Sequence, residues 1–446
     1  MDPVTPSVPT ARGAFDLRGL AGDAGLVIGA ALAANLLNYA FHFIVSRRLG
    51  PEQYGTLTAL LAIAALVGVV GTALNGVAVQ EAAALWVDHR DDDIGAFVRH
   101  AARGAFGVAL GVAVCILIAS LALAPYLHIE RWDLWIAFAV YCAANVFASF
   151  LRGCAQGAHR FGFFASSLIG ESVVKLIVAV TFIALGWQVL GALAGFVAGI
   201  SFAAGVLVPP FITRVVTSTY DQAEYSHLRL GGESVKVLGV GACIVALMFI
   251  DTIFAKHRLS GDEAGYYGAA GTIARIIPYG VSLIGLVLMP KAAAATHASR
   301  ESLSRLLAIS FGAGLLVTAV VVALLVGAPN LVIAVSYGPR FAASIPLLRL
   351  YAVDEGILGA CTLGFAYLVA VRDYRVSRFL VPAVVLEGLL MSWLGKTAVA
   401  LLLVAIAINA ALVPCIAFCV VQALRAAPLE HQSHAPQAPS PPSAEL

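Results

Sequence analysis

Two charged residues, Asp251 and Arg275, lie inside apolar stretches of the chain that are long enough to cross a membrane. A charge at that depth is costly in a bilayer, so it usually faces a cavity or a partner. A guanidinium binds phosphate oxygens through a planar fork, which makes Arg275 the first candidate to contact a diphosphate or a glycan. Arg275 could instead form a structural ion pair with Asp251 or extend its head group to the membrane surface. Asp251 could be that counter-charge, or a group that takes up and releases a proton.

A second set of polar residues lies in two other apolar stretches. Glu171 and Lys175 are four residues apart with the glutamate first, the order that pairs best on a helix. We expect them to pair with each other, either facing a cavity or holding helices together, because a buried pair costs less than one buried charge. Asn35, Asn38 and His42 share one helical face. That face could line a path for a polar cargo or hydrogen-bond to neighbouring helices.

Further candidates of the same kind are Asn75, Asp354, Glu355 and Glu387. None belongs to a catalytic pattern, since the sequence has no GxSxG, no HExxH and no GxxxxGK[ST] loop for nucleotide phosphates. The seven cysteines are scattered without a CxxC pair, which favours small buried residues over a metal site. We therefore predict no enzyme activity, no metal and no cofactor. Energy would come from an H+ or Na+ gradient or from downstream consumption of a cargo.

The composition places most of the chain in a membrane. Of 446 residues, 61% are hydrophobic and 12% are charged, and the mean hydropathy is +0.92. Soluble domains carry about 25% charged residues, roughly twice as many. No basic run suggests nucleic-acid binding. Hydropathy predicts an all-α integral membrane protein with about twelve spans, at about 24–46, 55–79, 98–124, 132–152, 163–185, 188–212, 235–256, 265–289, 303–327, 345–371, 376–394 and 398–422.

The longest internal polar stretch divides these spans into two sets of six. The predicted organisation is an amino-terminal segment, a six-helix bundle, a linker, a second six-helix bundle and a disordered tail, at 1–23, 24–213, 214–234, 235–422 and 423–446. Of the 27 basic residues, 17 fall on one side of the membrane and seven on the other. This bias predicts that both termini, with the linker, are cytoplasmic. The segment Gln80–Arg103 has mixed charge and an apolar face, which predicts a helix and loop along the membrane surface.

The two halves carry related turns. LGPEQYG begins at Leu49 and LSGDEAGYYG begins at Leu259, and each has an acidic turn followed by a Tyr-Gly pair and a helix. With six spans per half, the two copies have the same orientation. Parallel repeats of this kind are one architecture of secondary transporters, with the substrate path between the repeats. In the second copy, Pro278 follows Arg275 by three residues and can kink or break the helix.

Four segments resemble the polysaccharide transporter branch of the multidrug/oligosaccharidyl-lipid/polysaccharide (MOP) flippase superfamily: SRRLGPEQYGTLTAL, FIDTIFAKHRLSGDEAGYYGAAGTIAR, VLMPK and SYGPRFAASIPLLRLY. The resemblance covers spans one to ten. It implies two six-helix bundles that form a V around a central cavity. It also implies that the chain moves undecaprenyl-diphosphate-linked oligosaccharide across the bacterial inner membrane. The partners would then be that lipid-linked oligosaccharide, membrane lipids, a polysaccharide polymerase and chain-length proteins.

Other functions stay open at this stage. A lipid II flippase is less favoured, because that group typically has fourteen spans. A cation-coupled multidrug antiporter would share the fold and differ in cargo. A membrane polysaccharide polymerase or ligase would need a sizeable extracytoplasmic loop with acid and base residues, and the predicted loops on that side are short. A scaffold without transport would leave the charges in at least four spans unexplained.

Overall fold

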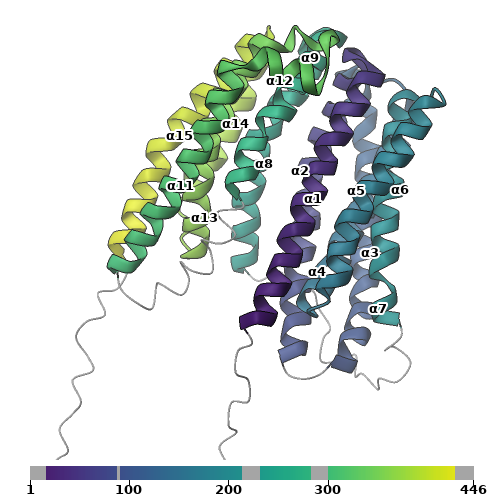
Figure 1. The fold of residues 1–446 in the computed structure, drawn as a ribbon, viewed down its shortest axis with the longest axis vertical. Coiled ribbons are helices and arrows are strands. Elements are labelled where there is room, and N and C mark those ends of the chain that lie inside the picture. Colours follow the sequence, from purple (N-terminus) through teal and green to yellow (C-terminus); the bar gives the residue numbers. More distant parts are fainter. Residues whose placement is uncertain (1–16, 88–90, 213–231, 283–299, 427–446) are drawn as a thin grey trace, which may run out of the picture. The chain divides into compact units, whose positions relative to one another are not determined.

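The computed structural model describes residues 17–87, 91–212, 232–282 and 300–426, and these fold almost entirely into helices (Figure 1). The helices of the amino-terminal half are α1 (Leu17–Leu49), α2 (Pro51–Val87), α3 (Asp91–Leu127), α4 (Trp132–Gly157), α5 (Phe161–Ala184), α6 (Gln188–Leu207) and the short α7 (Pro209–Ile212). Those of the carboxy-terminal half are α8 (Gly232–Arg258), α9 (Gly261–Ala274), α11 (Arg300–Gly327), α12 (Pro329–Ser336), the 3-10 turn η1 (Pro339–Phe341), α13 (Ser344–Ala370), α14 (Ser377–Leu394) and α15 (Ala398–Ala426).

The helical, membrane-spanning character predicted from hydropathy is confirmed. Within the described ranges, 11 helices are long and apolar enough to cross a bilayer. Eleven of the twelve predicted spans coincide with these helices. The remaining span, 265–289, begins in α9 and continues past residue 282, where the described residues end. Most of the predicted amino-terminal segment, linker and tail also falls outside the described residues.

Some boundaries differ from the predictions. Helix α1 already begins at Leu17, and α8 begins at Gly232. The predicted surface segment Gln80–Arg103 is also wrong in part. Helix α2 continues to Val87 and α3 starts at Asp91, so this segment largely extends the two long helices. Mixed charge there reflects helix ends that pass beyond the apolar layer, since 37 residues of α-helix span about 55 Å and the hydrocarbon core only about 30 Å.

The chain divides into two compact units. Unit 1 consists of Met1–Val45, Val70–Ser120 and Arg131–Arg229, and unit 2 consists of Ser46–Val69, Leu121–Glu130 and Leu230–Leu446. The division near residue 230 falls inside the predicted linker. Two segments of the amino-terminal half nevertheless group with unit 2, so the assignment of whole bundles to 24–213 and 235–422 stays a prediction.

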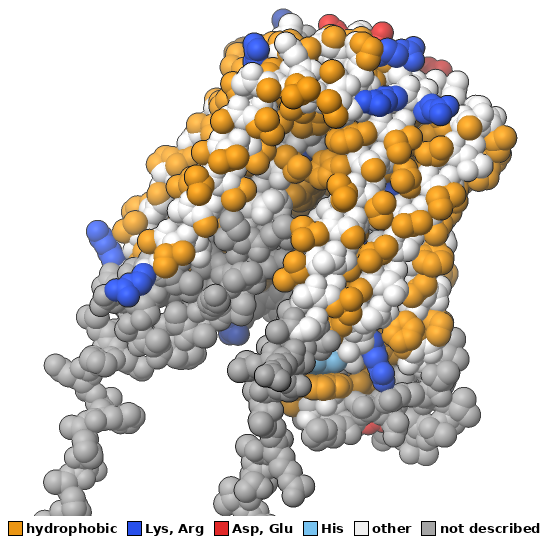
Figure 2. All heavy atoms as spheres, in the orientation of Figure 1, with side chains coloured by type: hydrophobic (Ala, Val, Ile, Leu, Met, Phe, Trp, Pro, Cys, Tyr) orange, Lys and Arg blue, Asp and Glu red, His pale blue; other side chains and the backbone are white. Residues whose placement is uncertain are grey.

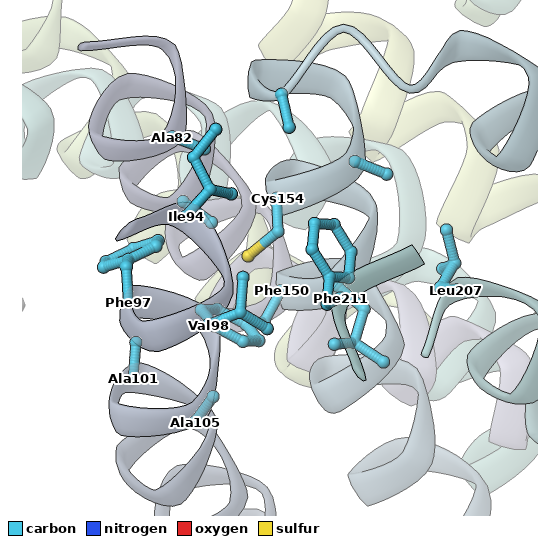
Figure 3. Packing of buried hydrophobic residues seen from close by; sticks show 14 of the residues in the cluster. Ala82, Ile94, Phe97, Val98, Ala101, Ala105, Phe150, Cys154, Leu207 and Phe211 are labelled. Atoms are coloured by element: carbon cyan, nitrogen blue, oxygen red, sulfur yellow. The ribbon is translucent and has the colours of Figure 1, made fainter. Parts of the chain in front are cut away.

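In unit 1, α5 and α6 pack unusually close together because glycines line the contact. A Cβ added at Gly195 would lie 2.6 Å from the carbonyl oxygen of Lys175, and one at Gly199 would lie 2.6 Å from that of Glu171. Small residues allow two helix backbones to approach in this way. At the ends of α2, α3, α4 and α6, a hydrophobic cluster that includes Phe97, Phe150 and Phe211 fills the space between the helices (Figure 3).

In unit 2, the two turns that the sequence suggested to be repeats pack against each other. A Cβ added at Gly265 would lie 1.9 Å from the carbonyl oxygen of Pro51, and one at Gly55 would lie 2.7 Å from the backbone nitrogen of Gly265. Beside this contact, the hydroxyls of Tyr54 and Tyr337 form a hydrogen bond of 2.9 Å. The first part of α2 is therefore a structural component of unit 2.

The outward faces of the helices suit contact with lipid. Large apolar side chains such as Leu36 and Trp393 are 72% and 75% exposed. Figure 2 shows hydrophobic side chains spread along the helices in view, with most Lys and Arg side chains near helix ends. Exposed apolar surface of this extent is expected where hydrocarbon rather than water is the solvent.

Candidate functional site

Most of the candidate residues from the second half converge inside unit 2. Asp251 on α8, Arg275 after α9, Glu355 on α13 and Glu387 on α14 are all buried, with Glu387 at 0% exposure. Asp354 is buried next to Glu355 on α13. We call these five residues the acidic cluster. Its members come from four different segments, so the fold of unit 2 is what brings them together.

The position of Arg275 follows from a break in its helix. Helix α9 begins at a capping box in which Ser260 and Glu263 bond each other's backbone N–H. It ends at Ala274, and residues 276–282 resume a helical course. Pro278 has no N–H to donate to the carbonyl of Ala274, which explains the break as predicted. The guanidinium therefore leaves the helix at an interruption and reaches α8 and α13.

Arg275 is fully engaged by protein groups. Its Nη2 lies 3.0 Å from Oδ1 of Asp251 and donates to Oγ1 of Thr252 at 2.9 Å. Its Nε donates to the carbonyl oxygen of Met248 at 2.9 Å and lies 3.3 Å from Oε1 of Glu355. The structural ion pair with Asp251, one of the three interpretations open from the sequence, is thus the one observed. Contact between this guanidinium and a cargo would require these bonds to be exchanged.

Asp251 is equally well satisfied. Its Oδ1 accepts from the backbone N–H of Thr252 at 2.6 Å and from the Thr252 hydroxyl at 3.1 Å. Its Oδ2 accepts from the hydroxyl of Tyr267 at 3.0 Å and from the hydroxyl of Tyr351. These donors compensate the loss of water around a buried carboxylate. Asp251 and Arg275 form a fixed, neutral pair at the centre of the acidic cluster.

The other carboxylates have fewer partners. Asp354 accepts from Nδ2 of Asn409 at 2.8 Å, whereas Oε2 of Glu355 and both carboxylate oxygens of Glu387 have no hydrogen-bond partner among the described residues. Among the described residues, the cluster holds four carboxyl groups against one guanidinium. Burying the uncompensated negative charges would cost several kcal/mol each, so these groups must carry protons or hold a cation.

A second polar site lies in unit 1 and differs from its prediction. Glu171 forms its ion pair with Arg152, with Oε2 2.5 Å from Nη2, and the predicted pairing with Lys175 is wrong. Arg152 also donates from Nε to the hydroxyl of Ser167 at 3.2 Å. The i, i+4 rule describes an isolated helix, whereas here an arginine from α4 outcompetes the lysine on α5. We call Arg152, Glu171 and Lys175 the basic site.

Lys175 is buried at 3% exposure and has a neutral polar partner. Its ammonium group donates to Oδ1 of Asn38 and lies 5.4 Å and 4.8 Å from the ring centres of Phe41 and Phe196. These contacts stabilise a cation without neutralising it. Asn38 from the predicted polar face of α1 is therefore part of the basic site, with half-buried His42 one turn further along α1.

The remaining candidates lie apart from these contacts. Asn35 is exposed. Asn75 donates from Nδ2 to the carbonyl oxygen of Ser149 at 3.0 Å, which ties α2 to α4. The sequence reasoning also missed four residues that build the sites: Arg152, Tyr267, Tyr351 and Asn409. Tyr267 belongs to the Tyr-Gly pair of the repeated turn, so its recurrence was a usable signal.

The sequence and the fold match known proteins. A sequence profile of the family described as "Polysaccharide biosynthesis protein" matches residues 20–296. No curated protein matches the chain. Among solved structures, the fold resembles a multidrug resistance MATE family transporter of the MOP superfamily in its inward-facing conformation, with a TM-score of 0.74 at 14% identity, covering 91% of this chain and 100% of that one.

Two further solved structures show the same fold. A MATE transporter of Vibrio cholerae gives a TM-score of 0.60 at 15% identity, covering 92% of this chain and 98% of that one. A MOP superfamily transporter of Pyrococcus furiosus, described as having a binding pocket of reversed polarity, gives 0.54 at 14% identity, covering 91% and 95%. The predicted MOP-type fold is confirmed.

Proposed function

Because the chain belongs to the polysaccharide biosynthesis protein family, we propose that it is a flippase that moves undecaprenyl-diphosphate-linked oligosaccharide across the bacterial inner membrane by alternating access. The family match and the MOP-type fold support a membrane transporter. In this proposal both termini are cytoplasmic, as the basic residues of the sequence suggest. A polymerase and chain-length proteins would receive the oligosaccharide on the far side.

The observation that carries the proposal is the excess of carboxyl groups in the acidic cluster. A protein that only scaffolds other proteins gains nothing from four buried carboxyl groups around one guanidinium. A transporter that is driven by a proton or cation gradient needs a group that binds the ion differently in its two conformational states. Only such a difference in binding lets the ion shift the equilibrium between those states. The cluster supplies such groups without any bond being made or broken.

Within the cluster, Glu387 is the residue that we propose to take up the coupling H+ or Na+. Within the described ranges its two carboxylate oxygens have no hydrogen-bond partner, whereas Asp251 has several. A proton can therefore bind Glu387 without breaking an existing bond. Glu355, which keeps one unpartnered oxygen beside Arg275, would respond to the charge of Glu387.

The basic site is suited to the anionic part of the cargo. The ammonium group of Lys175 lies beside a neutral amide and two aromatic rings, so a diphosphate can attract it without displacing a carboxylate. The sequence favoured Arg275 for this contact. We now assign the first diphosphate contact to Lys175, since Arg275 already has two carboxylate partners.

Reconstitution of the purified full-length protein in liposomes tests the proposal. Transfer of a lipid-linked oligosaccharide to the outer leaflet is read by lectin access, with an inward- or outward-directed H+ or Na+ gradient. We expect transfer to respond to one of these gradients in the wild type and to lose that response in Glu387→Gln. Glu263→Gln, which changes a capping carboxylate on α9, is the matched control and should keep the response.

Two results would contradict this assignment. Gradient-driven efflux of cationic drugs without oligosaccharide transfer would support the multidrug antiporter instead, the alternative that the fold favours. Transfer of lipid II but not of other lipid-linked oligosaccharides would support the peptidoglycan alternative.

In cells, the wild type should restore surface polysaccharide to a flippase-null strain, and Arg275→Ala should not.

A further inference from the structure

A pocket of about 220 Å³ lies in unit 1, apart from the residues of the basic site. Its lining comes from the end of α2, the start of α3, the turn between α4 and α5, and α7: Trp86, Ile94, Gly95, Ala158, His159, Arg160, Pro210 and Phe211. We call it the turn pocket. Three of its residues, among them Ile94 and Phe211, also belong to the hydrophobic cluster of Figure 3. The cluster therefore gives the pocket a rigid apolar floor.

His159 is held in the pocket wall by an unusual backbone conformation. Its φ is +55°, in the left-handed region, and the N–H of Arg160 bonds to the carbonyl oxygen of Ala155 at 2.7 Å. This is the Schellman end of a helix, where glycine usually occupies the position of His159. Glycine would fit the turn with less strain, so the presence of an imidazole here indicates a use for the side chain.

The ring of His159 is also fixed by its neighbours. It stacks on Trp86 with ring centres 3.8 Å apart and an angle of 18° between the planes. Its Nδ1 lies 3.2 Å from the carbonyl oxygen of Gly157 and must donate in that bond. Nε2 is left to bind a ligand, and protonation would make it a donor while the indole stabilises the imidazolium.

Arg160 adds a permanent positive charge. Within the described part of the chain, its guanidinium has no ion pair or hydrogen bond, and the residues lining the pocket include no carboxylate. A free guanidinium beside an imidazole presents several donors to an anion, and its planar fork fits phosphate oxygens. The pocket has room for roughly seven water molecules, which suits a phosphate and part of its ester but no acyl chain.

The location of the turn pocket points to the origin of the phosphate. One membrane-crossing helix ends at Gly157, the next begins at Phe161, and a third ends at Phe211. Trp86 is 40% exposed beside them, and tryptophan is enriched where hydrocarbon meets head groups. We propose that the turn pocket binds the phosphate group of a membrane lipid through Arg160 and His159.

Lipid binding by the detergent-purified full-length protein tests this proposal. The probes are a short-chain phosphatidylglycerol, the matched diacylglycerol that lacks phosphate, and soluble glycerol phosphate, each titrated by calorimetry. We expect phosphatidylglycerol to bind at least about tenfold more tightly than either of the other two, because the phosphate and the interface both contribute. Equal binding of glycerol phosphate would show a soluble phosphate as the ligand and overturn the lipid assignment.

Three variants place the binding in the pocket. Arg160→Gln should weaken phosphatidylglycerol binding about tenfold, as expected for loss of a charge-assisted bond. His159→Gly should weaken it as well while the melting temperature stays the same or rises, because glycine relieves the left-handed turn. Arg103→Gln removes an exposed arginine of α3 outside the pocket lining and should change nothing. Wild-type affinity in Arg160→Gln and His159→Gly, or an equal loss in Arg103→Gln, would overturn the proposal.

Discussion

Unit 1 and unit 2 each bury a charged site, and the two sites have opposite signs. The basic site has two cationic side chains, Arg152 and Lys175, for one glutamate, whereas the acidic cluster has four carboxyl groups for one arginine. The excess charge in unit 1 lies beside aromatic rings and an amide, and the excess carboxyl groups in unit 2 include Glu387, which has no hydrogen-bond partner among the described residues. One helical architecture thus buries an excess of cationic side chains in one unit and an excess of carboxyl groups in the other.

The comparison also separates fixed from adjustable charges. In each unit one pair is locked, Arg152–Glu171 at 2.5 Å and Arg275–Asp251 at 3.0 Å. In each unit one group beside that pair forms no ion pair among the described residues, Lys175 in the first and Glu387 in the second. Locked pairs hold helices in register, whereas a charged group outside such a pair can respond to a ligand.

The largest expected effect is on the two locked pairs. Arg275→Met should lower the free energy of unfolding by about 3–5 kcal/mol, because it leaves Asp251 and Glu355 buried without their cation. Arg152→Met should cost less, since the side chains of its pair are 13% and 17% exposed and Glu171 can be hydrated. Thermal unfolding of both variants in the same detergent measures the difference. Equal losses would show that burial does not distinguish the two pairs.

The next largest effect should come from removing the positive charge of Lys175 in unit 1. Lys175→Met keeps the length and apolar stem of the side chain but removes the ammonium group. We expect transfer of a diphosphate-linked oligosaccharide to fall at least about tenfold, as for loss of a charge-assisted contact, with little loss of stability. The liposome assay measures transfer and thermal unfolding measures stability. Unchanged transfer would remove Lys175 from the cargo path and leave the basic site with a structural role.

A smaller effect should come from the packing that holds Lys175 in place. Gly199→Ala would put a methyl group 2.6 Å from the carbonyl oxygen of Glu171, and we expect it to cost about 1–3 kcal/mol. Gly205 lies on the same helix with no atom within 4 Å of an added Cβ, so Gly205→Ala is the control. That control should be neutral or stabilising by about 0.5–1 kcal/mol, the usual helix preference for alanine. Urea or SDS unfolding curves of the two variants measure these changes in the free energy of unfolding.

The smallest effect is expected at a pair outside the membrane spans, in which the side chain of Arg375 is 49% exposed and that of Asp373 is 10% exposed. A hydrogen bond from Arg375 lowers the pKa of Asp373 below its ordinary value of 3.8, and the two groups are 2.6 Å apart. The stabilisation is therefore fully present above pH 3.8 and disappears as the pH falls through the lowered pKa. Asp373→Asn should reduce the melting temperature slightly at pH 7 and leave it unchanged at low pH. A large change at pH 7 would contradict the small contribution expected of an ion pair whose arginine is exposed to water.

Local features of the chain were predictable from the sequence. The helical spans follow from runs of apolar residues, and the break at Arg275 follows from the missing N–H of Pro278. Buried charges are rare enough in such runs that Asp251 and Arg275 were found directly, with their ion pair as one of three interpretations. Each of these inferences depends only on residues close together in the chain.

Features that depend on helix rotation were not predictable. The pairing of Glu171 with Arg152 joins residues of α4 and α5, and nothing local makes that arginine a better partner than Lys175. Glu387 was a candidate, but its approach to Asp251, Asp354 and Glu355 requires three helices to pack with particular faces inward. Asn75 was a candidate for the same reason as Asn38, yet the packing directs it to a backbone carbonyl of α4.

The close contact of Gly55 and Gly265 restricts where the chain can be cut into fragments that still fold. A fragment that starts near residue 230 would contain α9 but lack the backbone of Pro51 and Gly55 that covers it. Such a fragment would expose bare glycine faces that no side chain of its own can fill. We expect it to accumulate only when the amino-terminal fragment is synthesised in the same cell, so the two pieces should be co-expressed rather than purified separately and mixed.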